Sequence, residues 1–340
     1  MRVLITGGAG FIGSNVAKHF LDRNDDVTIF DNLSRHSARM NFQWLSTLAN
    51  PRLRTVIGDV RDPDALQKAV QGHDAVFHFA AQVAVTTSVS DPRTDFEINA
   101  LGTFNVLEAV RGLTENARPA VILTSTNKVY GEMLELPVVE LEKRYAYADL
   151  PSGVPETKPL DFHSPYGCSK GTADQYVRDY ARIYGLSTAV FRMSCIYGPR
   201  QYGTEDQGWV AHFMIATQAG RPMTVYGDGK QVRDILFVDD LIHAFSIVLG
   251  DMKKHSGGVF NIGGGPDNTL SLAELLEWLS SRSSGKVQFR VEDWRPGDQK
   301  IYVSNIDKAR DVLNWKPRVG VPEGLEKLWS WLASGASKAQ

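Results

Sequence analysis

Short apolar runs alternate with amphipathic segments through the first half of the chain. The runs have the length of strands, and the segments between them repeat apolar residues at helical spacing. This pattern predicts strands at residues 3–6, 27–30, 53–57, 75–79, 121–124 and 188–192, and helices at residues 14–22, 63–70, 103–111 and 172–184. Strands that alternate with helices favour an α/β fold, a doubly wound parallel sheet that binds ligands beyond the carboxyl ends of its strands.

The second half is less regular. Residues 140–165 hold four prolines and many charges, which indicates a long surface segment, and residues 197–208 have the polar composition of a loop over a site. Residues 235–248 return to a helical pattern, residues 259–262 resemble a strand, and a helix, a strand near 287–291 and a terminal helix follow. We expect a first domain at 1–192 plus about 233–263, a smaller discontinuous α/β lobe at about 193–232 plus 264–335, and a polar tail at 336–340.

Composition excludes several classes of function. Of 340 residues, 43% are hydrophobic and 22% charged, and the net charge of −2 provides no field for nucleic acid or an anionic membrane. Cys168 and Cys195 are too few for a disulfide scaffold or a zinc cluster, so we expect reduced thiols, no metal and a cytoplasmic protein. We expect no signal peptide, because the first residues run into a strand, and no apolar run approaches the ~20 residues of a membrane span.

A glycine-rich loop follows the first predicted strand and opens a helix. Gly7 permits a tight turn, Gly10 lets the backbone approach a pyrophosphate, and Gly13 lets the helix pack closely on the strand. Asp31 closes the second strand, where a carboxylate can bind the adenosine ribose hydroxyls and repel a 2′-phosphate. A strand, a glycine loop, a helix, a second strand and an acidic residue in this order predict a Rossmann domain that binds NAD. A plain glycine turn beside a capping Asp is the alternative, and Arg35 tempers the preference over NADP because an arginine can hold a phosphate.

Residues 164–170 read SPYGCSK. Serine before proline predicts a helix start, which places Tyr166 and Lys170 one turn apart on one face. A tyrosine has a pKa of about 10 and is a poor base near neutrality. The Lys170 ammonium and an oxidised nicotinamide, both positive, would lower the pKa of Tyr166 so that it can take a proton from a substrate hydroxyl as hydride leaves the same carbon. A Tyr-x-x-x-Lys sequence by itself is common by chance, but here it accompanies the glycine loop, and the combination favours a catalytic pair.

These motifs together resemble the extended, sugar-nucleotide branch of the short-chain dehydrogenase/reductase superfamily. The resemblance covers nearly the whole chain and includes the glycine loop, Asp31, Gly58-Asp59, Asn99, the Thr-Ser-Thr of 124–126, Tyr166 with Lys170, Arg233-Asp234, and Arg295 to Asp298. It implies that Thr126 hydrogen-bonds the substrate hydroxyl, with Tyr166 and Lys170 as its catalytic partners. It also implies homo-oligomers, commonly dimers built by the helix after Asn99 and the helix that carries Tyr166, with dimer and tetramer both left open.

The residues after Thr126 decide between reactions. Members of that branch that expel water from the sugar carry an Asp-Glu pair directly after the threonine, but this chain has Asn127 and Lys128. A carboxamide does not exchange protons near neutral pH, and an ammonium group cannot replace a carboxylate base. Oxidation can proceed while elimination lacks its acid and base, so the simplest remaining reaction is epimerisation. Alternatively, Asn127 and Lys128 only satisfy a turn.

Longer local matches narrow the resemblance to the CDP-paratose 2-epimerase (CDP-tyvelose epimerase) family. They lie at 124–131 (TSTNKVYG), 160–176, 197–201 and 205–209. The family implies tightly bound NAD⁺, a nucleoside-diphosphate hexose and transient oxidation at C2. Cys195 stands where many 4-epimerases have an asparagine, which weakens a 4-epimerase assignment. A 4-epimerase and a non-catalytic NAD-binding regulator remain the alternatives.

The expected site residues follow from these motifs and from the resemblance. The cofactor is expected at Gly7, Gly10, Phe11, Ile12, Gly13, Asp31, Asn32, Ser34, Arg35, Asp59, Val60, Phe79, Ala80, Ala81, Asn99, Thr124, Tyr166, Lys170 and Met193. The substrate is expected at Gln82, Thr126, Asn127, Tyr166, Cys195, Gln201, Gln207, Trp209, Val225, Arg233, Arg295 and Asp298. Arg233 and Arg295 are candidates for the diphosphate, because a guanidinium pairs bidentately with phosphate oxygens, although internal ion pairs are the alternative.

Overall fold

The computed structural model describes residues 1–283, 287–295 and 298–336 and divides into two compact units. Unit 1 comprises residues 1–129, 164–192 and 242–260, and unit 2 comprises residues 130–163, 193–241 and 261–340. Residues 296–297 of the predicted Arg295–Asp298 motif and residues 337–340 of the predicted tail lie outside the described residues.

A seven-stranded sheet forms the centre of unit 1, in the order β12-β8-β5-β4-β1-β2-β3. Its strands are β1 (Arg2–Thr6), β2 (Asp26–Asp31), β3 (Leu53–Ile57), β4 (Ala75–His78), β5 (Ala120–Thr126), β8 (Thr188–Met193) and β12 (Gly258–Ile262). The pairs from β5 to β3 are parallel. The chain leaves β1 toward β2 on one side and returns to β4 on the other. In sheets of this kind, ligands bind beyond the carboxyl ends of the strands at such a switch point. The predicted doubly wound α/β fold is confirmed.

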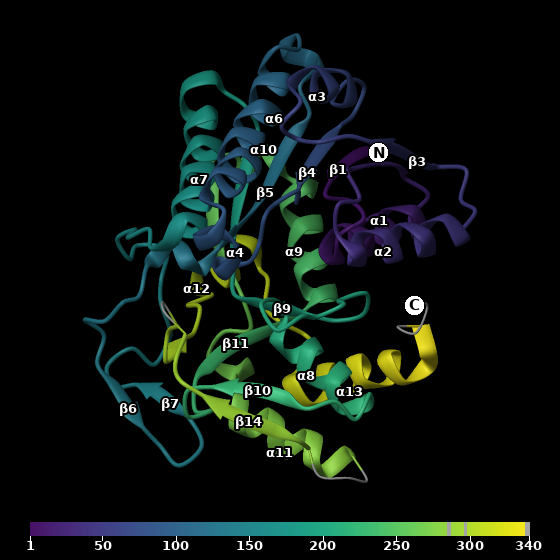
Figure 1. Cartoon of the computed structure of the whole chain (residues 1–340). Helices are drawn as coiled ribbons and strands as arrows, with labels where there is room; N and C mark the ends of the chain where they lie inside the picture. Colours follow the sequence, from purple (N-terminus) through teal and green to yellow (C-terminus); the bar gives the residue numbers. More distant parts are fainter. Residues whose placement is uncertain (284–286, 296–297, 337–340) are drawn as a thin grey trace. The chain divides into compact units, whose positions relative to one another are not determined.

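Helices cover both faces of this sheet (Figure 1). They are α1 (Phe11–Asp22), α2 (His36–Thr47), α3 (Pro63–Ala69), α4 (Val85–Ser90), α5 (Pro92–Phe96), the π-helical turn Glu97–Leu101, α6 (Gly102–Arg111), α7 (Ser164–Tyr184), α9 (Val238–Gly250) and α10 (Met252–His255). Successive side chains of β4 point to opposite faces. Val76 therefore joins the core under α3, α6 and α7, whereas Phe77 packs against Phe20 of α1 and Phe245 of α9.

Unit 2 is built from short sheets and helices. Its strands are β6 (Val138–Glu140), β7 (Tyr145–Tyr147), β9 (Cys195–Tyr197), β10 (Met223–Tyr226), β11 (Val232–Phe237), β13 (Thr269–Ser271), β14 (Phe289–Glu292) and β15 (Ile301–Tyr302). Its helices are α8 (Trp209–Gln218), α11 (Leu272–Arg282), α12 (Asp307–Leu313) and α13 (Val321–Trp331). β11 pairs with β13, β15 and β9, and β10 pairs with β14.

The structure differs from the sequence-based expectation in two regions. The helix expected over 235–248 begins only at Val238, because Ile235 to Phe237 complete strand β11 and pair with β9. Residues 130–163, expected as a surface segment of the first domain, group with unit 2. Their backbone and side chains bond there: Tyr145 N donates to the Lys230 carbonyl at 2.9 Å and Val154 N to the Val303 carbonyl at 2.7 Å.

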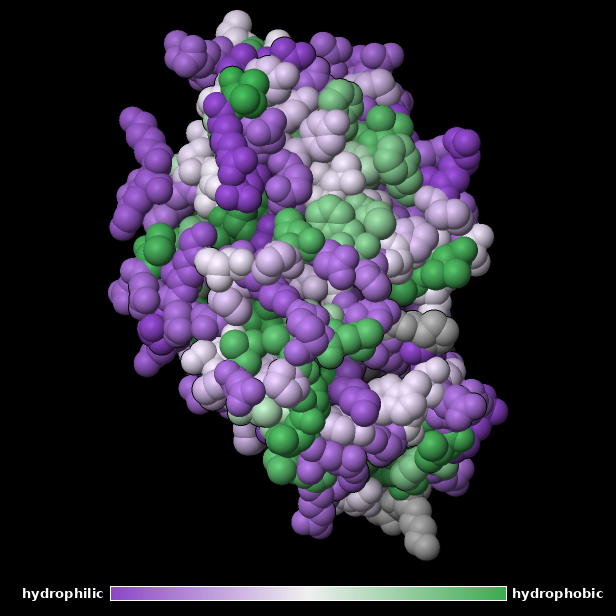
Figure 2. Space-filling view, turned by 90° about the vertical axis from the view of Figure 1, so that its left-hand side faces the viewer, coloured by the Kyte–Doolittle hydropathy of each residue, from purple (hydrophilic) through white to green (hydrophobic). Residues whose placement is uncertain are grey.

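The surface mixes polar and apolar residues. Figure 2 shows hydrophobic groups scattered among more numerous hydrophilic ones on the face in view. Among the residues that the structure describes, no helix combines the length and the apolar composition needed to cross a lipid bilayer.

Candidate active site

The glycine loop between β1 and α1 has the shape of a phosphate-binding loop. Gly7 has φ of +66°, and its N–H donates to the Phe30 carbonyl at 2.8 Å. A Cβ at Gly7 would lie 2.6 Å from Ala80 N, and one at Gly13 would lie 2.3 Å from the Gly7 carbonyl oxygen. Glycine is therefore required at both positions, and Gly10, which precedes Phe11, leaves the first turn of α1 without a side-chain cap. A cradle of this shape, at the positive end of a helix, fits a dinucleotide pyrophosphate.

Asp31 ends β2 beside this loop. Its carboxylate accepts hydrogen bonds from Ala9 N at 3.0 Å and Leu33 N at 2.8 Å. Burial raises the pKa of Asp31, while these two backbone donors and the charge of Arg35 act in the opposite direction. Each carboxylate oxygen keeps a second lone pair, so Asp31 can still accept from ribose hydroxyls.

Asp59 and Asn32 lie together at the ends of β3 and β2. The Asp59 carboxylate accepts from the Arg61 guanidinium at 2.9 and 2.8 Å and from Asn32 Nδ2 at 2.9 Å. The hydrogen bond from Arg61 holds the pKa of Asp59 well below its usual range. Arg61, which was not predicted from the sequence, occupies part of the hydrogen-bonding capacity of Asp59, a residue expected to contact the cofactor.

The buried side chain of His78 holds the carboxyl end of β4 in place through hydrogen bonds. It lies between the hydroxyls of Thr6 (2.6 Å) and Thr103 (3.0 Å), and burial lowers its pKa to about 3, so the ring is neutral. Phe79, Ala80 and Ala81 follow it, and Ala80 N faces Thr6 Oγ1 at 3.4 Å. A neutral histidine between two hydroxyls orders this edge without placing charge on it.

Thr126, Tyr166 and Lys170 meet in unit 1. Ser164 caps α7 by accepting from Gly167 N at 3.2 Å, as the Ser-Pro start predicted. Tyr166 N donates to Ser88 Oγ at 3.1 Å, and a hydrogen bond links the Tyr166 and Thr126 side chains. The Lys170 ammonium donates to the Thr124 carbonyl at 2.7 Å. Sequence positions 124, 126, 166 and 170 thus form one buried cluster at the end of β5.

Burial dominates the pKa values of this cluster. It raises the pKa of Tyr166 to about 12, while the bond with Thr126 and the charge of Arg35 act in the opposite direction. Burial lowers the pKa of Lys170 to about 8. The lower pKa expected for Tyr166 beside both Lys170 and an oxidised nicotinamide stays a prediction, because in the protein by itself desolvation outweighs the favourable interactions.

A polar network behind the cluster was not predicted. Asn99 binds both backbone groups of Gln82, accepting from its N–H at 2.9 Å and donating to its carbonyl at 3.1 Å. It also donates to Asp95 Oδ1 and to Ser169 Oγ, each at 3.1 Å. Ser169 donates to Asp95 Oδ2 at 2.5 Å. The one sequence signal for it was the four-residue spacing of Asp95 and Asn99, with Ser169 directly before Lys170.

The predicted site residues divide between the units. Unit 1 holds Thr126, Tyr166 and Lys170, the predicted cofactor residues other than Met193, and the predicted substrate residues Gln82 and Asn127. Unit 2 holds Met193 and the remaining predicted substrate residues, which are Cys195, Gln201, Gln207, Trp209, Val225, Arg233, Arg295 and Asp298.

Arg295 is held inside unit 2. It pairs with Glu205 at 3.2 Å and Asp206 at 3.4 Å, and its guanidinium lies 3.8 Å from the centroid of the Tyr226 ring. The internal ion pair left open by the sequence is thus present. Arg233, in β11, donates to the Val232 carbonyl at 2.8 Å.

Two buried polar atoms near the start of α8 lack hydrogen-bond partners among the described residues. They are Gln201 Oε1, in the loop before α8, and Trp209 Nε1, in the first residue of that helix. Gln201 is 7% exposed, and its Nε2 donates to the Ile196 carbonyl at 3.0 Å. An unsatisfied acceptor and an unsatisfied donor are suited to a hydroxyl-bearing ligand.

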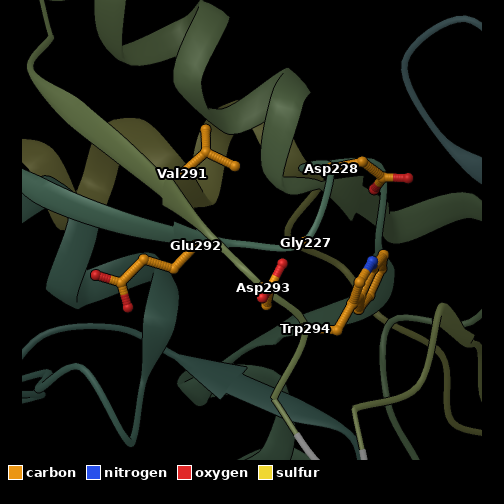
Figure 3. A pocket seen from close by; sticks show the side chains of 6 residues that line it. All are labelled: Gly227, Asp228, Val291, Glu292, Asp293 and Trp294. Carbon is orange, nitrogen blue, oxygen red and sulfur yellow. The ribbon is translucent and has the colours of Figure 1, made fainter.

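A cavity of about 790 Å³ lies beside the β10 and β14 strands (Figure 3). It is lined by Gly227, Asp228, Val291, Glu292, Asp293 and Trp294. The predicted substrate residues are not among its lining. Three carboxylates repel a diphosphate, so this cavity is not the predicted diphosphate site.

Comparisons with known proteins agree with this geometry. The family model described as GDP-mannose 4,6 dehydratase matches residues 4–328. The chain is 45% identical to a CDP-paratose 2-epimerase of Salmonella typhi, with 98% of this chain and 100% of the relative covered.

Two solved structures show the same fold with NAD bound. A dTDP-glucose 4,6-dehydratase of Streptomyces venezuelae is 30% identical, with a TM-score of 0.84 over 99% of this chain and 98% of that one. A UDP-glucuronic acid 4-epimerase of Bacillus cereus, solved with UDP-glucuronic acid and NAD, is 27% identical, with a TM-score of 0.83 over 98% of this chain and 99% of that one.

Proposed function

Because the chain belongs to the GDP-mannose 4,6-dehydratase family of extended short-chain dehydrogenases/reductases and is an NAD-dependent nucleotide-sugar epimerase, we propose that it inverts a CDP-hexose at C2. The proposed substrate pairs are of the CDP-paratose/CDP-tyvelose or CDP-glucose/CDP-mannose type. One observation carries the choice of epimerisation over dehydration: Asn127 and Lys128 follow Thr126. The relative that is 45% identical supports C2 as the centre.

The proposed roles follow from the cluster at the end of β5. When bound, NAD accepts a hydride from the substrate carbon and returns it to the other face of the resulting ketone. Tyr166 takes the hydroxyl proton and gives it back, and Thr126 hydrogen-bonds the same hydroxyl. Lys170, anchored on the Thr124 carbonyl, supplies positive charge one helical turn away. The buried position of all three side chains excludes water from the proton transfer.

The turn after Thr126 supports a reaction without elimination. Thr126 Oγ1 donates to Asn127 Oδ1 at 3.3 Å, and Lys128 N donates to Thr126 Oγ1 at 3.2 Å. Both residues therefore serve to orient the threonine hydroxyl. Neither carries a carboxyl group that could remove a proton next to the ketone or protonate a leaving hydroxide.

We assign cofactor binding to unit 1 and most of the substrate contacts to unit 2. Gln201 and Trp209 are the best-supported substrate residues, because each keeps a buried polar atom free for a ligand. Arg233 remains our candidate for the diphosphate. For Arg295 to bind phosphate, it must exchange its contacts with Glu205 and Asp206 for that ligand.

The proposal is tested with the purified protein, CDP-paratose and CDP-glucose, with the C2 epimer followed by NMR. A substrate deuterated at C2 should react more slowly than one deuterated at C4. Tyr166→Phe should lose turnover and keep NAD, whereas Tyr184→Phe, an exposed tyrosine at the end of the same helix, should behave as wild type. A C4 epimer, or a slower reaction with the C4-deuterated substrate only, would establish the 4-epimerase alternative. Turnover retained by Tyr166→Phe would refute the assigned base.

A non-catalytic NAD-binding regulator is the alternative of another class. The buried cluster of Thr126, Tyr166 and Lys170 argues against it, since a binding protein has no need of a base. No product with any CDP-, GDP- or UDP-hexose, from protein that holds NAD, would favour the regulator.

We also propose a homodimer through α6 and α7. Both helices expose large apolar side chains in unit 1: Phe104 is 38% exposed, Tyr176 44% and Ile183 66%, and the rings of Phe104 and Tyr176 are in contact at 5.9 Å. Large exposed apolar groups on neighbouring helices indicate an interface. Ile183→Glu should give monomers in light scattering; an unchanged mass would refute this interface.

A further inference from the structure

Asp95 is a buried carboxylate that the roles above do not use. It lies in α5 and is 0% exposed. Its two oxygens accept from Ser169 Oγ at 2.5 Å and Asn99 Nδ2 at 3.1 Å. In the described part of the chain it has no salt bridge, and the charged residues beside it, Arg93 and Glu97, pair with each other. A buried carboxylate without a contacting cation is costly unless a nearby charge compensates for it.

Lys170 is the candidate for that charge, because it follows Ser169, which bonds Asp95. It is 5% exposed, and its ammonium donates to the Thr124 carbonyl, which is neutral. Burial lowers the pKa of Lys170 to about 8, while the charges of Asp174 and then Asp95 act in the opposite direction. Asp174 already faces Arg192 in a bidentate pair at 2.9 Å, so that pair is neutral as a whole. Burial raises the pKa of Asp95, while its bond with Ser169 and then the charge of Lys170 act in the opposite direction. In its ionised form Asp95 has no cation in contact among the described residues, so its negative charge acts on Lys170.

The other groups around Lys170 do not replace Asp95. Helix α7 packs against α4, α5, the π-helical turn, α6 and β5. α4 and β5 carry no charged side chain. On α6, Glu108 is paired with Arg111 at 2.6 Å, and His78 is neutral at the end of β4. Asp95 is also the carboxylate that raises the pKa of Tyr166, although burial is the larger cause.

We propose that Asp95 is a positioning residue of the reaction: Ser169 and Asn99 fix it beside the Tyr166–Lys170 pair, where its negative charge keeps the Lys170 ammonium protonated. Asp95 acts on the reaction only through Lys170 and Tyr166. The inference rests on the catalytic roles proposed for those two residues, but not on which carbon is inverted. As a consequence, the pH at which activity falls on the alkaline side depends on the charge of Asp95.

The test is the pH profile of kcat/KM for the holoenzyme. Asp95→Asn keeps the shape of the side chain and removes its charge, so the alkaline limb should move down by roughly half a unit to one unit. That shift is a loss of about three- to tenfold at a pH on the falling limb. The acid limb should move in the same direction, because the pKa of Tyr166 falls too. Asp95→Glu should restore the wild-type limbs, and Asp179→Asn, an exposed carboxylate of α7, should leave them unchanged.

An unmoved alkaline limb in folded Asp95→Asn protein overturns the proposal. If that variant does not fold, Asp95→Ser, which also removes the charge and keeps a hydrogen-bonding oxygen, should show the same lowered alkaline limb. An unmoved limb in Asp95→Ser would overturn the proposal. Turnover in Tyr166→Phe would instead refute the proposed function. An inactive Tyr166→Phe together with an unmoved Asp95→Asn profile would refute the role of Asp95 alone.

Discussion

The ion pair of Asp174 and Arg192 ties helix α7, which carries Tyr166 and Lys170, to strand β8. Arg192 Nε and Nη2 donate to separate oxygens of Asp174, each at 2.9 Å. The side chains are 3% and 0% exposed, so both charges have left water. Asp174→Asn keeps the shape of the side chain and removes the charge, which leaves the buried guanidinium facing a neutral amide.

The expected magnitude follows from this burial. Removing one partner of a buried pair costs roughly 3–5 kcal/mol, because the remaining charge is still desolvated, whereas replacing both partners with apolar residues of similar volume is far less costly. We therefore expect Asp174→Asn to lower the free energy of unfolding by about 3–5 kcal/mol. The double variant Asp174→Leu with Arg192→Met should recover most of that loss. Asp179→Asn, which is exposed on the same helix, should stay within about 0.5 kcal/mol of wild type.

The assay must report on unit 1 by itself, because two compact units need not unfold together. Hydrogen exchange of the β8 amides in increasing urea measures the opening of that strand directly. A loss under about 1 kcal/mol for Asp174→Asn would refute the reasoning. So would a double variant as unstable as the single one, since that would mean that the charge pair, and not the uncompensated charge, supplies the stability.

Three further predictions concern other parts of the molecule. Gly13→Ala should weaken NAD binding at least tenfold in calorimetry, because its Cβ would lie 2.3 Å from the Gly7 carbonyl oxygen and displace the loop. Burial lowers the pKa of His78 from 6.5 to about 3. The unfolded state therefore binds the extra proton, and stability should fall by about 1.4 kcal/mol per unit as pH drops from about 6.5 toward 3, a slope that His78→Asn should reduce in urea unfolding. Ser271→Ala removes one half of the capping box with Glu274, and should cost about 1 kcal/mol in urea unfolding of unit 2.

The cofactor loop and the catalytic cluster were predictable from short-range interactions. Gly7 and Gly13 are required by backbone contacts within 3 Å, and a strand before them with a helix after them leaves few other conformations. The Ser-Pro start of α7 likewise places Tyr166 and Lys170 on one face of a helix. Strands that alternate with helices also predicted the parallel sheet, because such strands pair in parallel.

Contacts distant in sequence were not predictable. The apolar run at 235–237 suits a strand or a helix equally, and its pairing with β9 decides for the strand. Tyr130 joins unit 2 through a hydrogen bond to Asn261, 131 residues away. The Asp95–Ser169 bond spans 74 residues, so the sequence around neither residue indicates it. The ion pairs of Arg295 with Glu205 and Asp206 are of the same kind.

The contacts that the sequence did not predict alter the expected pKa values of the site more than its expected geometry. From the motif, the lysine and the cofactor together were expected to make Tyr166 acidic. In the folded chain, desolvation raises the pKa of Tyr166 to about 12 and lowers that of Lys170 to about 8, so burial shifts each side chain toward its neutral form. The bond with Thr126 and the charge of Arg35 oppose this shift for the phenol, and the charges of Asp174 and then Asp95 oppose it for the ammonium. Burial keeps the Tyr166 hydroxyl protonated, so Tyr166 can act as a base only when added positive charge beside it lowers its pKa. The activity of Tyr166 should therefore depend on the charge of the bound cofactor, which ties proton removal to the oxidised state in which hydride can be accepted.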